Sequence, residues 1–174
     1  MILVSRMDKI TIKKASFKDW KKYKEIRLDA LQKDPESFGR AYEEEKDRSE
    51  SKWKEKLNDK NRVTLLVLNG DEAIGLLGII FESSAKIAHI ADIISVYLKK
   101  EYRGRGIASQ LMNEAIKVIK ARKRTKKIKL NVTTNQLSAV NLYKKFGFRI
   151  VGELKEEMKV NGKYYNSYVM ELLL

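Results

Sequence analysis

The fold is decided by the stretch Ile93-Ile94-Ser95-Val96-Tyr97-Leu98-Lys99-Lys100-Glu101-Tyr102-Arg103-Gly104-Arg105-Gly106-Ile107-Ala108-Ser109. Its first six residues predict a strand, and from Ile107 onward apolar residues recur every three or four positions, which predicts an amphipathic helix. Between them, Gly104 and Gly106 let the backbone approach a ligand closely, because neither carries a Cβ. The helix that begins there directs unsatisfied N–H groups and its positive dipole end at the same place. The stretch therefore predicts a phosphate or pyrophosphate site, to which the two arginines of the turn add positive charge.

Two other phosphate-binding turns do not match these residues. A Walker A loop requires Lys and then Ser or Thr after its last glycine, whereas Gly106 is followed by Ile107. A dinucleotide-binding turn requires a third glycine or alanine at the position of Ser109, and it lies in the first strand–helix unit of its domain. For the two-glycine turn taken alone, an ordinary tight turn without a ligand remains an alternative.

The segments on either side predict an α/β domain. Hydrophobic periodicity predicts helices at about residues 20–31, 49–57 and 107–119, and a short helix that ends near Phe146. Strands are predicted at residues 10–12, 63–68, 73–81, 87–98, 128–133, 148–154 and 164–173. This order indicates one mixed sheet with helices on both of its faces.

Composition limits the class of protein. The chain has 174 residues, of which 43% are hydrophobic and 34% charged, which suits one globular domain rather than a disordered chain. It has no cysteine, which excludes disulfides, thiolate metal sites and a cysteine nucleophile and favours a reducing compartment. Its single histidine, His89, alternates with apolar residues in a predicted strand, so we expect it to be structural and expect no metal site. We expect a cytoplasmic protein without a membrane span, with a leader at residues 1–6 and a single domain at residues 7–174.

The chain carries 37 Lys and Arg against 23 Asp and Glu, a formal net charge of +14. Such an excess favours a polyanionic partner, either nucleic acid, an anionic membrane or a phosphorylated cofactor. The densest basic run, residues 117–129, has no interleaved aromatic residues and no recognised nucleic-acid motif. A basic nucleic-acid-binding domain is therefore the weaker alternative, and a solvated helix end is the simpler interpretation.

Two motifs, in order, resemble those of the Gcn5-related N-acetyltransferase (GNAT) superfamily. Arg103-Gly104-Arg105-Gly106-Ile107-Ala108 resembles the family's Gln/Arg-x-x-Gly-x-Gly/Ala pyrophosphate loop. Ala139-Val140-Asn141-Leu142-Tyr143-Lys144-Lys145-Phe146-Gly147-Phe148 is similar to its Ala-x-x-Leu-Tyr-x-x-x-Gly-Phe element. The resemblance covers about residues 10–174 and implies a mostly antiparallel sheet in which the parallel strands at 87–98 and 128–133 splay apart around the cofactor.

The resemblance implies transfer of an acetyl group from acetyl-CoA to a primary amine by direct attack in a ternary complex. Many members have Asn at the position of Gln136, so the amide that contacts the cofactor is left open between Gln136, Asn135 and Asn141. The other implied cofactor contacts are Val96, Tyr97, Leu98, Arg103, Gly104, Arg105, Gly106, Ile107, Ala108 and Ser109. A CoA-binding regulatory module without turnover is an alternative to an enzyme.

Acetyl transfer requires two proton movements, because an amine with a pKa near 10.4 is almost fully protonated at pH 7 and because the departing thiolate must be protonated. The resemblance makes Tyr143 the candidate general acid, although a buried aromatic of the helix face is the simpler interpretation. Asp92 is the candidate general base, and Glu43, Glu44 and Glu45 are alternatives.

The first two helices, the loop between them and the closing strands form the acceptor side in the family, and the candidate substrate-binding residues there are Arg27, Phe38, Tyr42, Tyr164 and Tyr165. Arg27 could hold a substrate carboxylate, whereas residues 43–45 could attract a polyamine, and the sequence leaves a small-molecule amine and a protein or peptide amine both open. The apolar end at residues 170–174 suits either a core strand or a homodimer contact.

Overall fold

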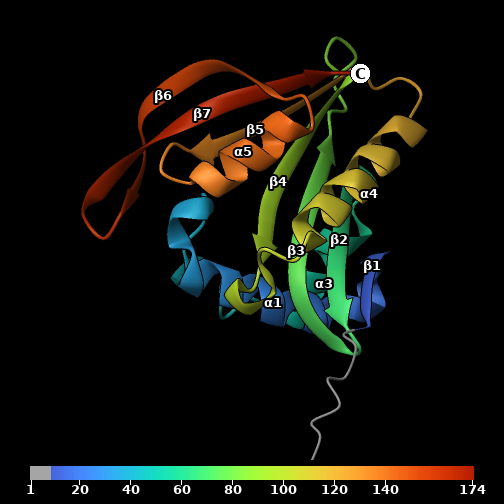
Figure 1. Cartoon of the computed structure of the whole chain (residues 1–174). Helices are drawn as coiled ribbons and strands as arrows, with labels where there is room; N and C mark the ends of the chain where they lie inside the picture. Colours follow the sequence, from blue (N-terminus) through green and yellow to red (C-terminus); the bar gives the residue numbers. More distant parts are fainter. Residues whose placement is uncertain (1–8) are drawn as a thin grey trace, which may run out of the picture.

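The computed structural model describes residues 9–174, and the leader expected at residues 1–6 lies outside the described residues. These residues form one seven-stranded sheet in the order β1-β2-β3-β4-β5-β7-β6 (Figure 1). The strands are β1 (Ile10–Lys14), β2 (Arg62–Asn69), β3 (Glu72–Phe81), β4 (Ile90–Leu98), β5 (Lys127–Thr133), β6 (Arg149–Val160) and β7 (Lys163–Leu173). Only β4 and β5 run parallel, so the mixed, mostly antiparallel sheet is confirmed.

Helices cover both faces of this sheet. The helices are α1 (Trp20–Lys33), α2 (Tyr42–Glu45), α3 (Glu50–Asn58), α4 (Ile107–Ala121) and α5 (Leu137–Lys145). A turn at residues 17–19 precedes α1, and there the Asp19 carboxylate accepts hydrogen bonds from the Ser16 backbone N–H and hydroxyl at 2.9 and 3.0 Å. The helix ends just before Pro35, which has no N–H to continue it. None of the described helices is long and apolar enough to cross a membrane.

Because successive side chains of a strand point to opposite faces of the sheet, the core consists of two layers, one on each face. On one face, Leu77 and Ile93 pack in the layer that includes Leu111 of α4 and Tyr143 of α5. On the other face, residues such as Leu66 pack in the layer that includes α1 and Trp53 of α3. The central strands β2 and β3 are buried on both faces for this reason.

The parallel pair is short. It is joined only between Ile90–Asp92 of β4 and Lys127–Lys129 of β5, after which the two strands part (Figure 1). Beyond this point β4 pairs only with β3 and β5 only with β7. The expected splayed parallel pair is therefore present.

A β-bulge interrupts β4 beside the splay. Leu76 faces Tyr97 and Gly78 faces Ile94, so β4 has one more residue in this interval than β3, and Ser95 adopts a φ of +54°. A Cβ on Gly78 would lie 2.9 Å from the Ile94 side chain, so a glycine is needed where the bulged strand approaches β3. The bulge directs part of the β4 backbone away from regular pairing.

Three sequence expectations differ from the structure. The strand expected from residue 87 begins at Ile90, so His89 is an exposed turn residue rather than a strand residue, and its carbonyl accepts the N–H groups of Lys126 and Lys127. The short helix α2 was not predicted. Strand β6 continues to Val160, past the end expected at residue 154, because its polar second half pairs with β7 without needing a buried face.

The basic run is only partly a solvated surface. Arg122 at the end of α4 lies over the Phe81 ring, with its guanidinium carbon 3.7 Å from the ring centroid, and donates a hydrogen bond to the Lys60 carbonyl. At the other end of the chain, Met170 is fully buried whereas Leu173 is 71% exposed. A homodimer contact through this apolar end stays a prediction.

Candidate active site

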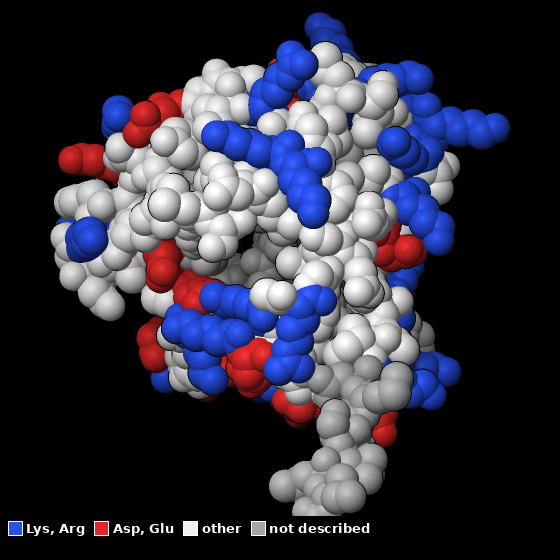
Figure 2. Space-filling model, in the orientation of Figure 1, with Lys and Arg blue, Asp and Glu red and all other residues white. Residues whose placement is uncertain are grey.

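A cleft of about 1470 Å³ lies where β4 and β5 part. Asp92, Lys129 and Asn131 line it from the sheet face that α1 and α3 cover, and Tyr143 lines it from the opposite face. Figure 2 shows its opening as a hollow in the middle of the surface, with Lys and Arg side chains gathered along the lower side. Because lining residues come from both faces, the cleft passes through the sheet at the splay.

Asp92 stands at the last position of the parallel pair. Its carboxylate lies 3.4 Å from the ammonium nitrogen of Lys129, the residue directly opposite on β5. Burial raises the pKa of Asp92 above its ordinary value, and the Lys129 charge only partly opposes this rise. A carboxylate with a raised pKa beside a cleft is a better proton acceptor than an ordinary surface carboxylate.

Tyr143 reaches the cleft from α5. Its side chain is 5% exposed, and its ring centroid lies 6.0 Å from that of Phe148. Burial raises the pKa of the Tyr143 hydroxyl well above its ordinary value, so the group stays protonated at neutral pH. Tyr143 is thus both a core aromatic residue and a lining residue of the cleft. Its position is compatible with both interpretations made from the sequence, a general acid and a buried aromatic.

A buried ion pair supports the β4 bulge from the α1 side. The Arg27 guanidinium donates two hydrogen bonds to the Glu45 carboxylate, at 3.1 and 3.2 Å, and a third to the Ser95 hydroxyl at 3.1 Å. Its Cζ atom also lies 4.8 Å from the centroid of the Phe38 ring. All of these residues line the cleft. Arg27 therefore links Ser95, the residue of the β4 bulge that has a positive φ, to α1 and α2.

The two-glycine turn lies outside this cleft, at the start of α4. Gly104 and Gly106 have φ values of +76° and +78°, and a Cβ on either would meet no protein atom within 4 Å. The Gln110 N–H donates to the Gly106 carbonyl, so the three helical N–H groups before it make no intrahelical bond. Open space in front of these donors fits a diphosphate.

The two arginines of the turn are held by neighbours. The Arg103 Nε donates to the Leu98 carbonyl at 2.7 Å, and its guanidinium forms an ion pair with Asp34 at the end of α1. The Arg105 guanidinium carbon lies 5.5 Å from the Tyr102 ring centroid. Arg103 therefore ties the turn to the start of the loop that follows α1.

The three amide residues considered as cofactor contacts take different positions in the structure. Gln136 lines the cleft, where its amide donates to the Ser37 hydroxyl. Asn135 and Asn141 are exposed and do not line it. The proposed acceptor residues Phe38 and Tyr42 both line the cleft, whereas the buried Tyr97 side chain points toward α1 and donates to the Asp29 carboxylate at 2.8 Å.

The other carboxylate and histidine candidates take different positions. Glu45 is buried in the Arg27 pair, Glu44 lines the cleft but bonds to Arg40, and Glu43 is exposed. His89 does not line the cleft. Within residues 9–174, no group of three or more His, Asp or Glu side chains is arranged to hold a metal ion.

Residues 23–148 match the family model described as "Acetyltransferase (GNAT) family". The chain belongs to this family. Curated relatives include the L-amino acid N-acetyltransferase AaaT of Escherichia coli, 33% identical over 70% of this chain and 75% of the relative, and the spermidine N(1)-acetyltransferase of Vibrio cholerae, 29% identical over 59% and 60%. The chain is thus an acetyl-CoA-dependent N-acetyltransferase.

Solved GNAT structures share the whole fold. An acetyltransferase of Streptococcus pneumoniae matches with a TM-score of 0.81 and 25% identity, over 95% of this chain and all of that one. Arabidopsis thaliana NAA60 in complex with acetyl-CoA matches with a TM-score of 0.74 over 95% and 98%, but at 19% identity this similarity concerns the fold alone.

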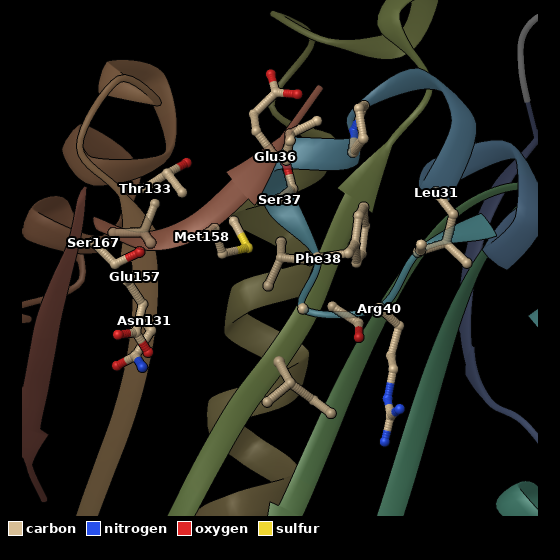
Figure 3. A pocket seen from close by; sticks show the side chains of 18 of the residues that line it. Leu31, Glu36, Ser37, Phe38, Arg40, Asn131, Thr133, Glu157, Met158 and Ser167 are labelled. Atoms are coloured by element: carbon tan, nitrogen blue, oxygen red, sulfur yellow. The ribbon is translucent and has the colours of Figure 1, made fainter. Parts of the chain in front are cut away.

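Several cleft residues of this GNAT enzyme were not found from the sequence. Glu157 and Met158 reach the cleft from β6, and Thr133 and Ser167 face it from β5 and β7 (Figure 3). Glu157 and Met158 lie at a second bulge, where Leu154 pairs with Ser167 and Met158 with Tyr165. The sequence pointed to the closing strands only through Tyr164 and Tyr165, which do not line the cleft.

Asn166 is what holds this bulge. Its side-chain oxygen accepts the Glu156 N–H, and its amide donates to the Glu153 carboxylate, both at 2.9 Å. The Oγ1 atom of Thr133 is buried and has no hydrogen-bond partner among residues 9–174. The cleft thus has an unsatisfied polar atom beside the bulged strand.

Proposed function

We propose that this enzyme binds acetyl-CoA on the α4–α5 face and a primary amine on the α1–α3 face, and that the amine attacks the thioester directly in a ternary complex. One observation carries the proposal: the cleft passes through the sheet, with Asp92 on one face and Tyr143 on the other. A donor and an acceptor that meet at such an opening need no covalent enzyme intermediate. The absence of cysteine from the chain is consistent with direct attack.

The cofactor groups fit residues of this chain. The open space before α4 and the positive φ of Gly104 and Gly106 suit the pyrophosphate, with N–H donors from Ile107, Ala108 and Ser109. The β4 backbone from Val96 to Leu98 would pair with the pantetheine arm. When bound, acetyl-CoA supplies the activated acetyl group, and a backbone N–H of the bulged strand would stabilise the oxygen on which negative charge develops.

Asp92 would take the proton from the acceptor ammonium. Its burial and raised pKa support this role, and the Lys129 ammonium beside it would keep the carboxylate ionised at neutral pH. The proton passes from the amine nitrogen to the Asp92 carboxylate, and the freed lone pair then forms the new C–N bond.

Tyr143 would return a proton on the other side of the sheet. Its hydroxyl stays protonated at neutral pH and lines the cleft, so it can donate to the departing thiolate. The acceptor class proposed from the relatives is a small primary amine, because one of them is named for L-amino acids and another for spermidine.

Thermal unfolding with and without acetyl-CoA, followed by a thiol-release assay, tests the proposal. A ligand at about 100 times its dissociation constant adds roughly 2.7 kcal/mol to the free energy of unfolding, a rise of a few degrees in Tm. ATP and NAD should not reproduce this rise. Stabilisation without thiol release across a broad amine panel would favour the regulatory module instead.

A further inference from the structure

A group of cations lines the end of the cleft next to α3. Arg48, Lys56 and Arg62, which we call the cationic wall, also line a smaller hollow of about 810 Å³ beside it. Arg48 precedes α3, Lys56 belongs to α3, and Arg62 is the first residue of β2. Three separate segments therefore bring positive charge to one place.

The positive charges at the cationic wall outnumber the carboxylates that pair with them. The buried Glu45 carboxylate lies 3.3 Å from the Lys56 ammonium and 3.4 Å from the Arg48 guanidinium, and it already accepts two hydrogen bonds from Arg27. One carboxylate thus faces three cations before Arg62 is counted. This leaves a local positive potential at that end of the cleft.

Nearby acids do not correct the imbalance. Glu55 and Asp59 line the smaller hollow. The Glu55 carboxylate pairs with Lys52 at 3.1 Å, and the Asp59 carboxylate accepts the Asn61 N–H at 2.8 Å. Neither forms an ion pair with a member of the cationic wall.

Arg62 is the member of the wall without a partner. Its Nε atom is buried and has no hydrogen-bond partner among residues 9–174, and its guanidinium pairs with no carboxylate of this part of the chain. A buried donor left unsatisfied destabilises the folded state, and more so when the group is charged. Arg62 as a whole is only partly buried and lines the cleft, so its guanidinium can meet an acceptor that a ligand supplies.

The pKa of Lys56 is lowered as expected for a partly buried cation with other cations beside it. Burial is the largest cause that lowers this pKa to about 8, the positive charges of Arg48 and Arg27 lower it further, and Glu45 only partly opposes them. An anion in the cleft would relieve this repulsion.

The cationic wall lies within the reach of a small acceptor. Arg62 pairs with Ile80 and Ile80 with Asp92, so Arg62 and Asp92 stand in one row on one face with a single strand between them. Two strand spacings separate their backbones by about 10 Å. A molecule with its amine at Asp92 can therefore present a second group to the long Arg62 side chain.

We propose that the cationic wall binds a carboxylate of the acceptor, so that the acceptor class is a small amine that also carries a carboxylate. The inference rests on the proposed acetyl transfer, which places the amine at Asp92. Charge-assisted hydrogen bonds from a guanidinium to a carboxylate are among the strongest in proteins. A polyamine would instead bring a second cation against Arg62 and Lys56. Free amino acids and short peptides share the required pair of groups.

Matched acceptors test the proposal. Each of six amino acids is compared, as an acceptor, with its own carboxamide: alanine, leucine, serine, lysine, tryptophan and 4-aminobutanoate. Leucylglycine serves as the peptide acceptor and spermidine as the polyamine. Wild type is compared with Arg62→Gln, with Arg62→Lys and with the control Lys54→Gln, which alters an exposed cation of α3 outside the cleft. Steady-state rates are measured at saturating acetyl-CoA.

We expect the carboxylate form to be preferred in wild type, and we expect Arg62→Gln to raise its KM about 10- to 100-fold while the carboxamide KM stays unchanged. Arg62→Lys should recover part of the loss, and Lys54→Gln should resemble wild type. A preference for leucine over leucylglycine assigns the site to free amino acids, and the reverse assigns it to peptides. Equal use of acids and amides, or a preference for spermidine, overturns the proposal.

A binding measurement separates this inference from acetyl transfer itself. Thermal unfolding with CoA is measured with N-acetylleucine and with N-acetylleucinamide. If no amine is acetylated but N-acetylleucine alone stabilises wild type and not Arg62→Gln, then acetyl transfer fails and the carboxylate site stands. If amines are acetylated without any dependence on Arg62 or on a carboxylate, then the site fails and acetyl transfer stands.

Discussion

The two faces of the sheet build their parts of the site from different material. On the α4–α5 face, the turn proposed to bind the pyrophosphate consists of backbone: two glycines with positive φ and the N–H groups of one helix that make no intrahelical bond. On the α1–α3 face, the cleft wall consists of side chains from α1, α2, α3, β4, β5 and β6. The proposed cofactor site thus depends mainly on local backbone geometry, whereas the proposed acceptor site depends on side chains that only the folded chain brings together.

The largest expected effect tests Tyr143, the proposed proton donor on the α4–α5 face. Tyr143→Phe should lower kcat about 10²- to 10⁴-fold, because it removes the proposed proton donor, and should leave the KM for acetyl-CoA nearly unchanged. The exposed Tyr164, which does not line the cleft, gives the control Tyr164→Phe. Wild-type kcat in Tyr143→Phe would make Tyr143 a packing residue only.

The buried side-chain network on the α1–α3 face should lose much of its stability when a single carboxylate is removed. Glu45→Gln leaves Arg27 and Lys56 without their buried carboxylate and should lower the free energy of unfolding by about 3–5 kcal/mol, measured in urea. The pKa of Glu45 is lowered in the folded protein, so its stabilisation is complete above the ordinary Glu pKa of about 4.3 and is lost as pH falls through the folded value. The difference between variant and wild type should therefore shrink in acid.

Glu55→Gln is the matched control, because Glu55 pairs only with an exposed lysine. It should leave urea unfolding nearly unchanged. If both variants behave alike, then the buried network does not hold the acceptor face together.

The next largest effect is expected from a substitution in the two-glycine turn on the α4–α5 face. Gly106→Val should weaken acetyl-CoA binding about 100-fold, because the added side chain fills the space before α4 and strains a φ of +78°. Gly70→Val places the same side chain at a φ of +57° in the β2–β3 turn, again in open space. It should lower Tm comparably but leave acetyl-CoA titrations unchanged, and equal binding by the two variants would refute the loop assignment.

The smallest effect concerns the proposed base. Activity should rise with pH through the pKa of Asp92, and Lys129→Met should move this acidic limb of the kcat/KM profile to higher pH, because the lost cation had lowered that pKa. Lys127→Met is the control on the same strand, since Lys127 pairs with Glu171 instead. A limb that does not move would remove Asp92 from the mechanism.

The same contrast explains what sequence could predict. The turn at Gly104 and Gly106 and the succession of strands along the chain were predicted because local spacing encodes them. The parallel pairing of β4 with β5 was predicted from the family resemblance instead. Three features were not predicted: the Arg27–Glu45 pair, the unpartnered Arg62 and the bulge held by Asn166. Each depends on how side chains of different elements meet in the folded chain, which local spacing does not encode. His89 was misplaced because an alternating apolar pattern extends into a turn, where hydrophobicity no longer reports pairing.

The passage of the cleft through the sheet has a kinetic consequence. If CoA leaves by the α4–α5 side and the acetylated amine by the α1–α3 side, neither product blocks the exit of the other. Product inhibition should then be competitive for each product against its own substrate. A double-reciprocal plot should show intersecting rather than parallel lines. Under the proposed mechanism, the splay of two strands after three residue pairs would give one small domain a separate exit route for each of its two products.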